Sequence, residues 1–356
     1  MVGEISKAER SPLLPLRHQE GDFFLCDIFD AAPKGDMGSM EHPIFSLATK
    51  PDHRERRYER GNIYVRVRPG PDGLATVHDR DVLIYCISQV MAALNQGRKV
   101  SRTLRFTAFD LLAATNRQTN GQAYAALKSA LQRLQSTQIE TNITTGGIEQ
   151  IDIFSLIDRV RVVRETREGR MLDLEITLSD WVFNAIAGNE VLTLNRRYFQ
   201  LRKPLERRLY ELARKHCGRQ AEWRVGLDVL QEKTGSGSTA KEFKRLISKI
   251  IKDDQAHDHM PDYSFSLEAG IVLVRPKPEF TQHWEDLEGD TNPYFFVIPP
   301  LRPATYEKAK RAAPGHDVYA LEQEWRDWAT EMPRNPDAAF IGFCGKVAAR
   351  RSASRH

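Results

Sequence analysis

The sequence lacks any apolar run of membrane-spanning length and any apolar leader. A membrane-spanning helix needs about 20 mostly apolar residues, and no stretch of the chain approaches that length. Met1–Leu16 contains prolines and charges of both signs where a signal peptide needs an apolar block. We therefore expect a protein that stays in the cytoplasm and has no membrane partner.

The residue patterns of metal sites and common active sites are also missing. The four cysteines are too far apart for a C-x-x-C pair, and we interpret Cys26, Cys86, Cys217 and Cys344 as reduced structural residues. The motifs H-E-x-x-H and G-x-S-x-G are absent, and carboxylates do not cluster. The sequence predicts no metal, no cofactor and no catalytic residue, and hence a protein that is not an enzyme.

Net charge is small. The sequence has 52 Lys and Arg against 48 Asp and Glu, a net charge of +4. This excess does not by itself indicate a nucleic-acid partner, so the distribution of charge along the chain has to decide.

Two stretches of the chain repeat one order of elements, judged from apolar periodicity, capping residues and turn residues. The first stretch predicts a helix at Asp81–Gln96, a strand at Arg102–Phe106, a helix capped by Thr107, a polar turn at Asn116–Asn120, a helix at Gly121–Gln135, and a hairpin of Gln138–Ile143 and Glu149–Val163 with its tip at Thr144-Thr145-Gly146-Gly147. The second predicts a helix at Tyr198–Cys217, a strand at Trp223–Val225, helices at Leu227–Thr234 and Thr239–Asp254 around the turn Gly235–Ser238, and a hairpin of Tyr263–Leu267 and Ile271–Arg275.

This order is typical of a winged helix, a helix-turn-helix followed by a β-hairpin wing. Core positions repeat as well: Tyr124, Leu127 and Leu131 correspond to Phe243, Leu246 and Ile250. We predict an α+β protein with two tandem winged-helix domains and a helical C-terminal extension. The expected parts are an extension at 1–80 that packs on the first domain, winged helices at 81–190 and 191–278, a proline-rich linker at 279–303, and a helical region with a basic tail at 304–356.

In a helix-turn-helix the second helix enters the major groove, and its N-terminal residues meet base edges. Asn, Gln and Arg side chains can pair with adenine or guanine there. In the first domain this second helix is Gly121–Gln135. The helix and the turn before it therefore predict DNA contacts from Arg117, Gln118, Asn120, Gln122, Lys128, Ser129, Gln132 and Arg133. The corresponding helix of the second domain, Thr239–Asp254, is richer in lysine and suits phosphates. This helix and the turn before it predict contacts from Ser238, Thr239, Lys241, Lys244, Arg245 and Ser248. A merely solvated face remains the alternative for each helix taken alone.

The segment Arg196–Arg219 holds nine basic residues, opposed only by Glu206 and Glu211. We expect it to form a positive surface that contacts the DNA backbone. The residues assigned to that surface are Arg196, Arg197, Arg202, Lys203, Arg207, Arg208 and Lys215. Pairing of the two glutamates with neighbours one turn away is the alternative, but two acids cannot neutralise nine bases.

Two further patterns resemble catalytic or ligand motifs only superficially. His257-Asp258-His259 with Tyr263 is similar to the paired histidines and tyrosine of rolling-circle nucleases, but a charged residue stands between the histidines. Gly235–Lys241 lacks the Gly-Lys-Ser/Thr ending of a phosphate loop, and a turn before a helix explains it better.

Several stretches resemble the RepA-type plasmid replication initiator family, known as replication initiator protein A. The resemblance covers roughly Leu13 to Lys277. It is carried by DFFLCDIFDAA (22–32), MEHPIFSLATK (40–50), DVLIYCISQVMAA (81–93), RTLRFTAFDLLAATNR (102–117), TLSDW (177–181) and LRKPLERRLYELARKHCG (201–218).

The resemblance implies a non-catalytic tandem winged-helix protein that binds direct repeats in double-stranded DNA at a plasmid origin. It also implies opening of an adjacent A·T-rich duplex and attraction of host initiator and helicase-loading proteins. Self-association as a homodimer that represses its own promoter is implied as well. A transcriptional repressor with the same modules and a relaxase-like nuclease stay open as alternatives.

Overall fold

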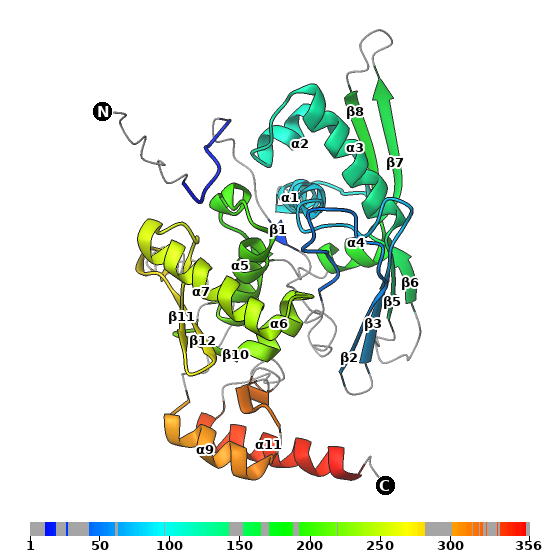
Figure 1. The fold of residues 1–356 in the computed structure, drawn as a ribbon. Coiled ribbons are helices and arrows are strands. Elements are labelled where there is room, and N and C mark those ends of the chain that lie inside the picture. The colour runs from blue at the N-terminus through cyan, green and yellow to red at the C-terminus, as the bar shows by residue number, and fades with distance from the viewer. Residues whose placement is uncertain are drawn as a thin grey trace, which may run out of the picture.

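The computed structural model describes residues 11–18, 26–27, 43–60, 63–95, 97–141, 152–164, 171–187, 192–218, 220–281, 301–314, 316–319, 321–322, 325, 333 and 335–353. The buried apolar residues form three cores, drawn from residues 44–186, from Ile84 together with residues 194–274, and from residues 301–344. We call the parts around these cores the first unit, the second unit and the C-terminal unit. Figure 1 shows the C-terminal helices below the second unit.

The first unit contains the predicted helix, strand, helix and helix. These are α1 (Arg80–Asn95), β4 (Thr103–Thr107), α2 (Ala108–Ala114) and α3 (Gly121–Ser136). The two later helices start where their caps predict: the Thr107 hydroxyl accepts from the Asp110 amide at 3.0 Å, and the Asn120 side chain accepts from the Ala123 amide at 3.0 Å. These caps fix where α2 and α3 begin, and the Asn120 cap ends the turn between them.

Two antiparallel sheets complete the first unit, which also contains α4 (Asp180–Ala187). In one sheet, β4 pairs with β8 (Met171–Leu178), and β8 pairs with β7 (Ile157–Arg164). The other has the order β2 (Arg56–Arg60), β3 (Ile63–Arg68), β5 (Gln138–Thr141) and β6 (Asp152–Ser155). Residues expected to form an extension of the first domain thus supply two strands of a four-stranded sheet, and β3 lies where the alternation of Asn62–Val67 indicates a strand.

The structure corrects the predicted first hairpin. The expected strand Glu149–Val163 divides at the buried residue Leu156 into β6 and β7, which lie in different sheets. Of these two strands, β6 pairs with β5, whereas β7 forms with β8 the hairpin that joins β4. The predicted tip, Thr144-Thr145-Gly146-Gly147, lies outside the described residues.

The second unit begins near β9 (Leu192–Thr193), which pairs with β1 (Cys26–Asp27). It continues through the 3-10 helix η2 (Arg196–Gln200), α5 (Pro204–His216), β10 (Trp223–Gly226), α6 (Leu227–Thr234), α7 (Ala240–His257), β11 (Tyr263–Glu268) and β12 (Ile271–Pro276). Its sheet has the order β10-β12-β11, which corresponds to β4-β8-β7 in the first unit. In both units the strand before the helix pair bonds to the last strand of the hairpin.

The C-terminal unit contains α9 (Pro303–Ala312) and α11 (Pro336–Ala353), which pack around Tyr306, Phe340 and Trp325. Within the helical region expected at 304–356, the sequence indicates helices at Thr305–Ala312, Val318–Ala329 and Pro336–Arg350. The first and last correspond to α9 and α11, and most of Val318–Ala329 lies outside the described residues. Cys86, Cys217 and Cys344 are buried free thiols. Within the described part of the chain, no helix combines the length and apolar character needed to cross a bilayer.

Candidate nucleic-acid interface

Helix α3 presents a polar surface opposite its apolar stripe. The stripe of Leu127, Ala130, Leu131 and Leu134 is buried, as predicted. The exposed predicted residues are Gln122, Lys128 and Gln132 on the helix and Gln118 and Asn120 in the turn before it. Ser129 is half-buried, and its hydroxyl donates to the Ala125 carbonyl at 3.3 Å. Exposed amides thus lie on both sides of the helix centre, with Gln118, Asn120 and Gln122 at its N-terminal end and Gln132 and Gln135 toward its C-terminal end.

Two arginines assigned to this surface point inward instead. Arg133 donates to both carboxylate oxygens of Asp79, at 2.7 and 2.8 Å, and this bond raises the pKa of Arg133. Arg117 donates to Asp81 at 3.0 Å and to the His78 carbonyl. Their side chains are only 19 % and 20 % exposed, so neither is a first choice for reading bases.

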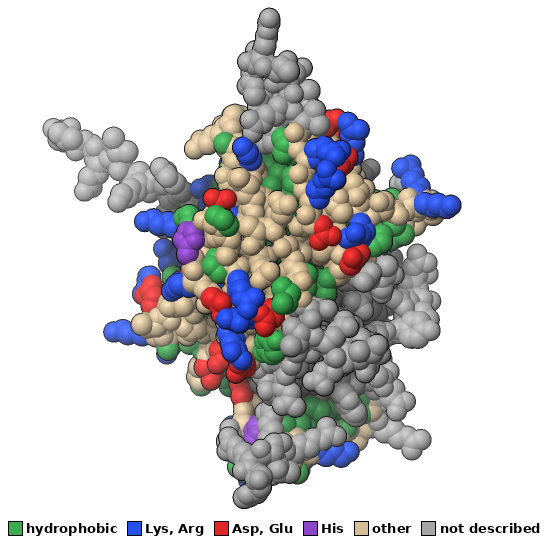
Figure 2. Space-filling view, turned by 90° about the vertical axis from the view of Figure 1, so that its right-hand side faces the viewer, with side chains coloured by type: hydrophobic (Ala, Val, Ile, Leu, Met, Phe, Trp, Pro, Cys, Tyr) green, Lys and Arg blue, Asp and Glu red, His purple; other side chains and the backbone are tan. Residues whose placement is uncertain are grey.

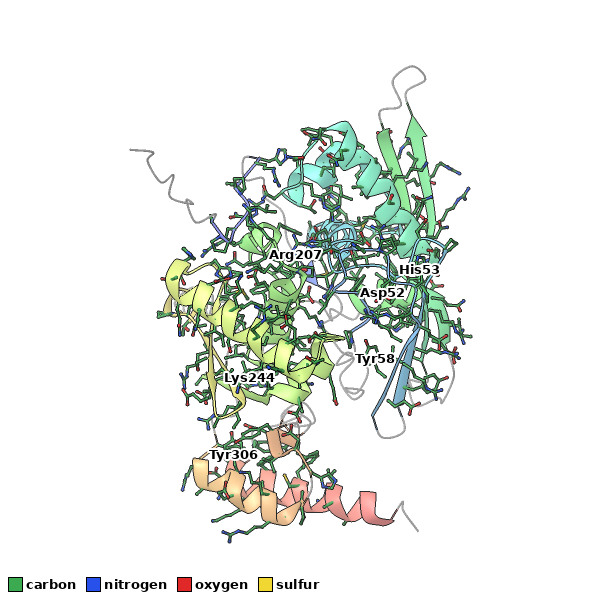
Figure 3. All side chains as sticks on the ribbon, viewed as in Figure 1. Asp52, His53, Tyr58, Arg207, Lys244 and Tyr306 are labelled. Atoms are coloured by element: carbon green, nitrogen blue, oxygen red, sulfur yellow. The ribbon has the colours of Figure 1, made fainter. Side chains whose placement is uncertain are left out.

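Helix α7 is the more basic of the two candidate helices. Lys241, Lys244 and Arg245 are exposed, and Lys244 is labelled on α7 in Figure 3. Arg245 is bound by Glu242 of the same helix at 2.6 Å, whereas no carboxylate among the described residues lies within ion-pair distance of Lys241 or Lys244. Lys249 and Lys252 extend this exposed row. Charge for phosphate contacts is therefore available along α7.

The turn before α7 contributes less. Thr239 caps the helix by accepting from the Glu242 amide at 3.3 Å. Ser238 and Ser248 are half-buried, and the Ser238 hydroxyl lies 2.9 Å from that of Ser236. These hydroxyls mainly fix the turn and the start of the helix.

The basic segment Arg196–Arg219 is not the uniformly exposed surface that was expected, and the structure corrects this point. Arg207 and Arg208 are 3 % and 6 % exposed. Figure 3 places Arg207 in the middle of the molecule, where α5 meets α1. In this arrangement neither guanidinium can reach a DNA phosphate.

The other basic residues of this segment are partly engaged. Arg197 donates to the Asp258 carbonyl at 2.7 Å, and the exposed Arg202 donates to the Leu13 carbonyl at 3.1 Å. Lys203 binds Glu206 and Asp253 at 2.8 and 3.0 Å. Arg196 and Lys215 are half-buried. Of the seven residues predicted here, only Arg202 is fully exposed.

The buried arginines join the second unit to the first. Glu211 of α5 accepts from Tyr198 at 2.6 Å and forms ion pairs with Arg208 at 3.2 Å and with Arg80, at the start of α1, at 2.5 Å. One residue further along α1, Asp81 forms an ion pair with Arg207 at 2.6 Å. We call these contacts the joint; Ile84 of α1 extends it by packing in the second core.

A second contact between the units lies at Gly235, the C-cap of α6. Its φ of 71° is left-handed, which favours glycine. A Cβ there would collide with Pro43 of the first unit. The Gly235 carbonyl accepts from Arg56 of β2 at 3.5 Å, and Arg56 is held by Asp52 at 2.8 Å. The glycine predicted only as a turn residue thus also permits close packing between units.

The residues that resembled a nuclease motif do not form a site. His259 is buried and lies 3.2 Å from Glu206, whereas His257 is exposed at the end of α7. The buried Tyr263 donates its hydroxyl to the Gly218 carbonyl at 3.1 Å, and burial raises the pKa of this phenol. No cluster of metal-ligating side chains occurs among the residues that the structure describes.

The sheet face of the first unit is charged but balanced. Figure 2 shows Lys and Arg side chains beside Asp and Glu over this face. The pairs include Arg105–Asp173 at 3.3 Å and Arg161–Glu175 at 3.1 Å across the sheet β4-β8-β7. Arg159 is also exposed on β7. This hairpin was missed as the partner of β4, although alternation in residues 159–163 is its sequence signal.

Comparison with known proteins identifies the chain's relatives. The family model described as replication initiator protein A matches residues 34–265. A protein of Wigglesworthia glossinidia brevipalpis, described as "Putative replication protein", is 35% identical over 260 residues, which cover 72% of this chain and 93% of the relative.

Solved structures show a similar fold. The crystal structure of RctB domains 2-3 has a TM-score of 0.50 and 13% identity, and the match covers 70% of this chain and 99% of that one. A second structure of these two RctB domains, from selenomethionine derivatives, also has a TM-score of 0.50 and covers 67% and 96%. Because the family model spans more than half of the sequence and a relative is 35% identical over most of it, the chain belongs to the replication initiator protein A family.

Proposed function

We propose that this protein initiates plasmid replication by binding repeated double-stranded DNA sites at the origin through two winged-helix units. The observation that carries the proposal is the repeated arrangement. Each unit has a strand, a helix pair and a hairpin in the same topology, and the second helix of each pair exposes polar or basic side chains. In winged-helix proteins this helix is the one that enters the major groove. The family membership supports the role in replication initiation.

The two helices are suited to different tasks. Helix α3 offers amides at its N-terminus, where side chains reach base edges. Helix α7 offers a row of lysines, which suit phosphate contacts that set position without reading sequence. In this proposal α3 supplies most of the discrimination between sites, and α7 supplies much of the affinity.

The remaining parts of the proposal follow from the family. The protein opens an adjacent A·T-rich duplex by binding energy, attracts host initiator and helicase-loading proteins, and represses its own promoter as a homodimer. It works in the cytoplasm. These steps need no catalytic group of its own.

The test uses the DNA beside the gene and the full-length chain. We expect footprints over short iterated repeats next to an A·T-rich tract, and loss of plasmid replication when the gene is removed and its restoration when the protein is supplied in trans. Footprints confined to a promoter, with replication intact in cells that lack the protein, would contradict the proposal and favour a repressor.

Replacing Lys241 and Lys244 together by alanine should weaken binding to all duplexes. If each lysine contacts one phosphate, the slope of log K against log salt should become shallower by about 1.8, because each contact releases about 0.9 counterion. Binding constants measured at several salt concentrations check this. The control is Lys308→Ala with Lys346→Ala, two exposed lysines of the C-terminal unit. Equal slopes for the wild type and the α7 variant would remove these lysines from the interface.

Gln122→Ala should instead reduce the preference for the cognate repeat. Losing one bidentate base contact costs about 1–3 kcal/mol of discrimination, with little change in non-specific binding. Competition between cognate and scrambled duplexes measures this ratio. Gln135→Ala, at the other end of α3, is the matched control because it is exposed but lies in the last turn of the helix. An unchanged ratio for Gln122→Ala would exclude a base contact by this side chain.

A further inference from the structure

A cavity of about 400 Å³ lies where the first unit, the second unit and the N-terminal segment 11–18 meet. Its volume falls within the range of small-molecule sites, about 300–1,000 Å³. Thr76–Asp81 and α3 form walls from the first unit, Phe199 and Arg207 form a wall from the second, and Leu14 and Arg17 come from the N-terminal segment. An occupant would therefore touch three parts of the chain at once.

The side chains around this cavity carry an excess of positive charge. Its basic lining residues are Arg17, Lys50, Arg117, Arg133 and Arg207, and its acidic ones are Asp79 and Asp81. Five cations against two carboxylates leave an excess of three positive charges. A cleft with charge of one sign and low-dielectric walls concentrates ions of the opposite sign.

The carboxylates are already engaged with the deeper arginines. Asp79 is held by Arg133 at 2.7 Å, and Asp81 by Arg207 at 2.6 Å and Arg117 at 3.0 Å. The Nη1 group of Arg17 donates a hydrogen bond to the Asn116 carbonyl at 2.8 Å. Within the described ranges, no carboxylate lies within ion-pair distance of Arg17 or of the exposed Lys50.

The arginines also retain N–H groups that can donate to a ligand. A guanidinium has five N–H donors. Arg133 uses Nε and Nη2 on Asp79, and Arg17 uses Nη1, so each retains further donors. Planar forks of this kind match the oxygens of a phosphate group. Leu14, Pro51 and Phe199 supply apolar wall beside these donors.

We propose that this cavity binds a phosphate ester, with Arg17 and Lys50 as its principal anion contacts. The ester is supplied either by a free nucleotide or by one phosphate of a bound DNA strand, since Ala126 and Arg133 of α3 also line the cavity. Because walls come from both units, the bound ester stabilises the joint between them. Binding of a free nucleotide does not depend on the proposed DNA-binding role.

The test titrates the full chain with ATP, ADP and inorganic phosphate by calorimetry and thermal denaturation. We expect saturable binding and a rise in Tm that grows with ligand concentration. Arg17→Gln with Lys50→Gln should weaken binding by about tenfold or more, the effect of losing one charge-assisted hydrogen bond. Arg17→Lys with Lys50→Arg, which keeps the charges, should retain most of the affinity. The matched control is Arg98→Gln with Lys99→Gln, an exposed pair after α1.

The same variants distinguish the two sources of phosphate. Saturable binding of ATP or ADP that is lost in the Arg17/Lys50 variant identifies a free nucleotide. If no free ligand binds but DNA affinity falls in this variant and not in the Arg98/Lys99 control, the phosphate belongs to DNA. If no free ligand binds and DNA affinity falls equally in both variants or in neither, the proposal is wrong. A Tm of the unliganded variant equal to that of the wild type shows that folding is intact.

Discussion

Replacing Glu211 by glutamine is expected to lower the free energy of unfolding by about 3–5 kcal/mol, the cost of removing one partner from a buried ion pair. Glu211 is fully buried and faces the side chains of Arg80 and Arg208, which are 1 % and 7 % exposed. Burial already lowers the pKa of Arg80 against the effect of Glu211. With a neutral amide in place of the carboxylate, both buried guanidinium groups would lose the charge of this ion-pair partner. The glutamine oxygen can still accept from Tyr198, but the amide nitrogen would then face the donors of Arg80 and Arg208, so the loss includes this donor–donor contact as well as the charge.

Urea and thermal unfolding followed by circular dichroism measure this effect. Glu307→Gln is the control, because Glu307 pairs with Lys310 on the exposed surface of α9 and its loss should leave Tm unchanged. The double variant Arg80→Gln with Glu211→Gln should lose less than the sum of the two single variants, because the groups are coupled. Strictly additive losses would show that the pair does not act as a unit.

Because Arg207 and Arg208 belong to the joint, substitutions of these α5 residues have a different expected effect from substitutions of exposed basic residues. If Arg207 and Arg208 contacted phosphates, alanine variants would mainly flatten the salt dependence of DNA binding. Their burial instead implies lost stability and loss of the fixed arrangement between the two units. Under the proposed function the two units read neighbouring parts of one site and need that arrangement, so we expect such variants to bind DNA poorly even with both helix faces intact.

Sequence could not place these arginines because, apart from Glu211 one turn after Arg208, their partners are distant in the chain. Counting charges within Arg196–Arg219 weighs nine bases against Glu206 and Glu211. The main acceptors for Arg207 and Arg208 also include Asp81, 126 residues away, and the Lys233 carbonyl. A count of charges within the segment includes neither of these acceptors. The repeated helix order and the buried stripes of α3 and α7 were predictable, because periodicity and caps are local properties.

In the first hairpin the predicted pairing is present between β5 and β6, but the division of its second strand was not predicted, for a related reason. The alternation in residues 149–163 is interrupted at Ile153-Phe154 as well as at Leu156-Ile157, so the local pattern does not single out Leu156 as the division. The strand pairing sets the division: β6 pairs with β5, whereas β7 pairs with β8. In the second unit the chain goes directly from α7 to the hairpin, and there the two predicted strands agree with the structure.

The stability of the joint should fall as the pH falls from about 6.5 to about 4. His78 lies beside the joint, and burial lowers its pKa to about 4, helped by the charge of Arg207. Arg117 acts in the same direction, and Asp81 and Asp79 oppose it. An unfolded histidine has a pKa of about 6.5, so the unfolded chain binds more protons between these two values. The free energy of unfolding therefore decreases with falling pH, by about 3 kcal/mol over the whole interval.

His78→Gln should remove this dependence, because glutamine has no proton to gain. The clearest interval is pH 6.5 to 5, above the range in which most carboxylates titrate. Unfolding in urea at several pH values gives the slope, which should be close to one proton in the wild type at pH 5 to 6 and near zero in the variant. His53→Gln, whose side chain is exposed on the connection before β2, should keep the wild-type slope. A wild-type slope near zero would show that His78 does not titrate with unfolding. The same slope in His78→Gln as in the wild type would assign the proton to another group, and the link between acidity and the joint would then be lost.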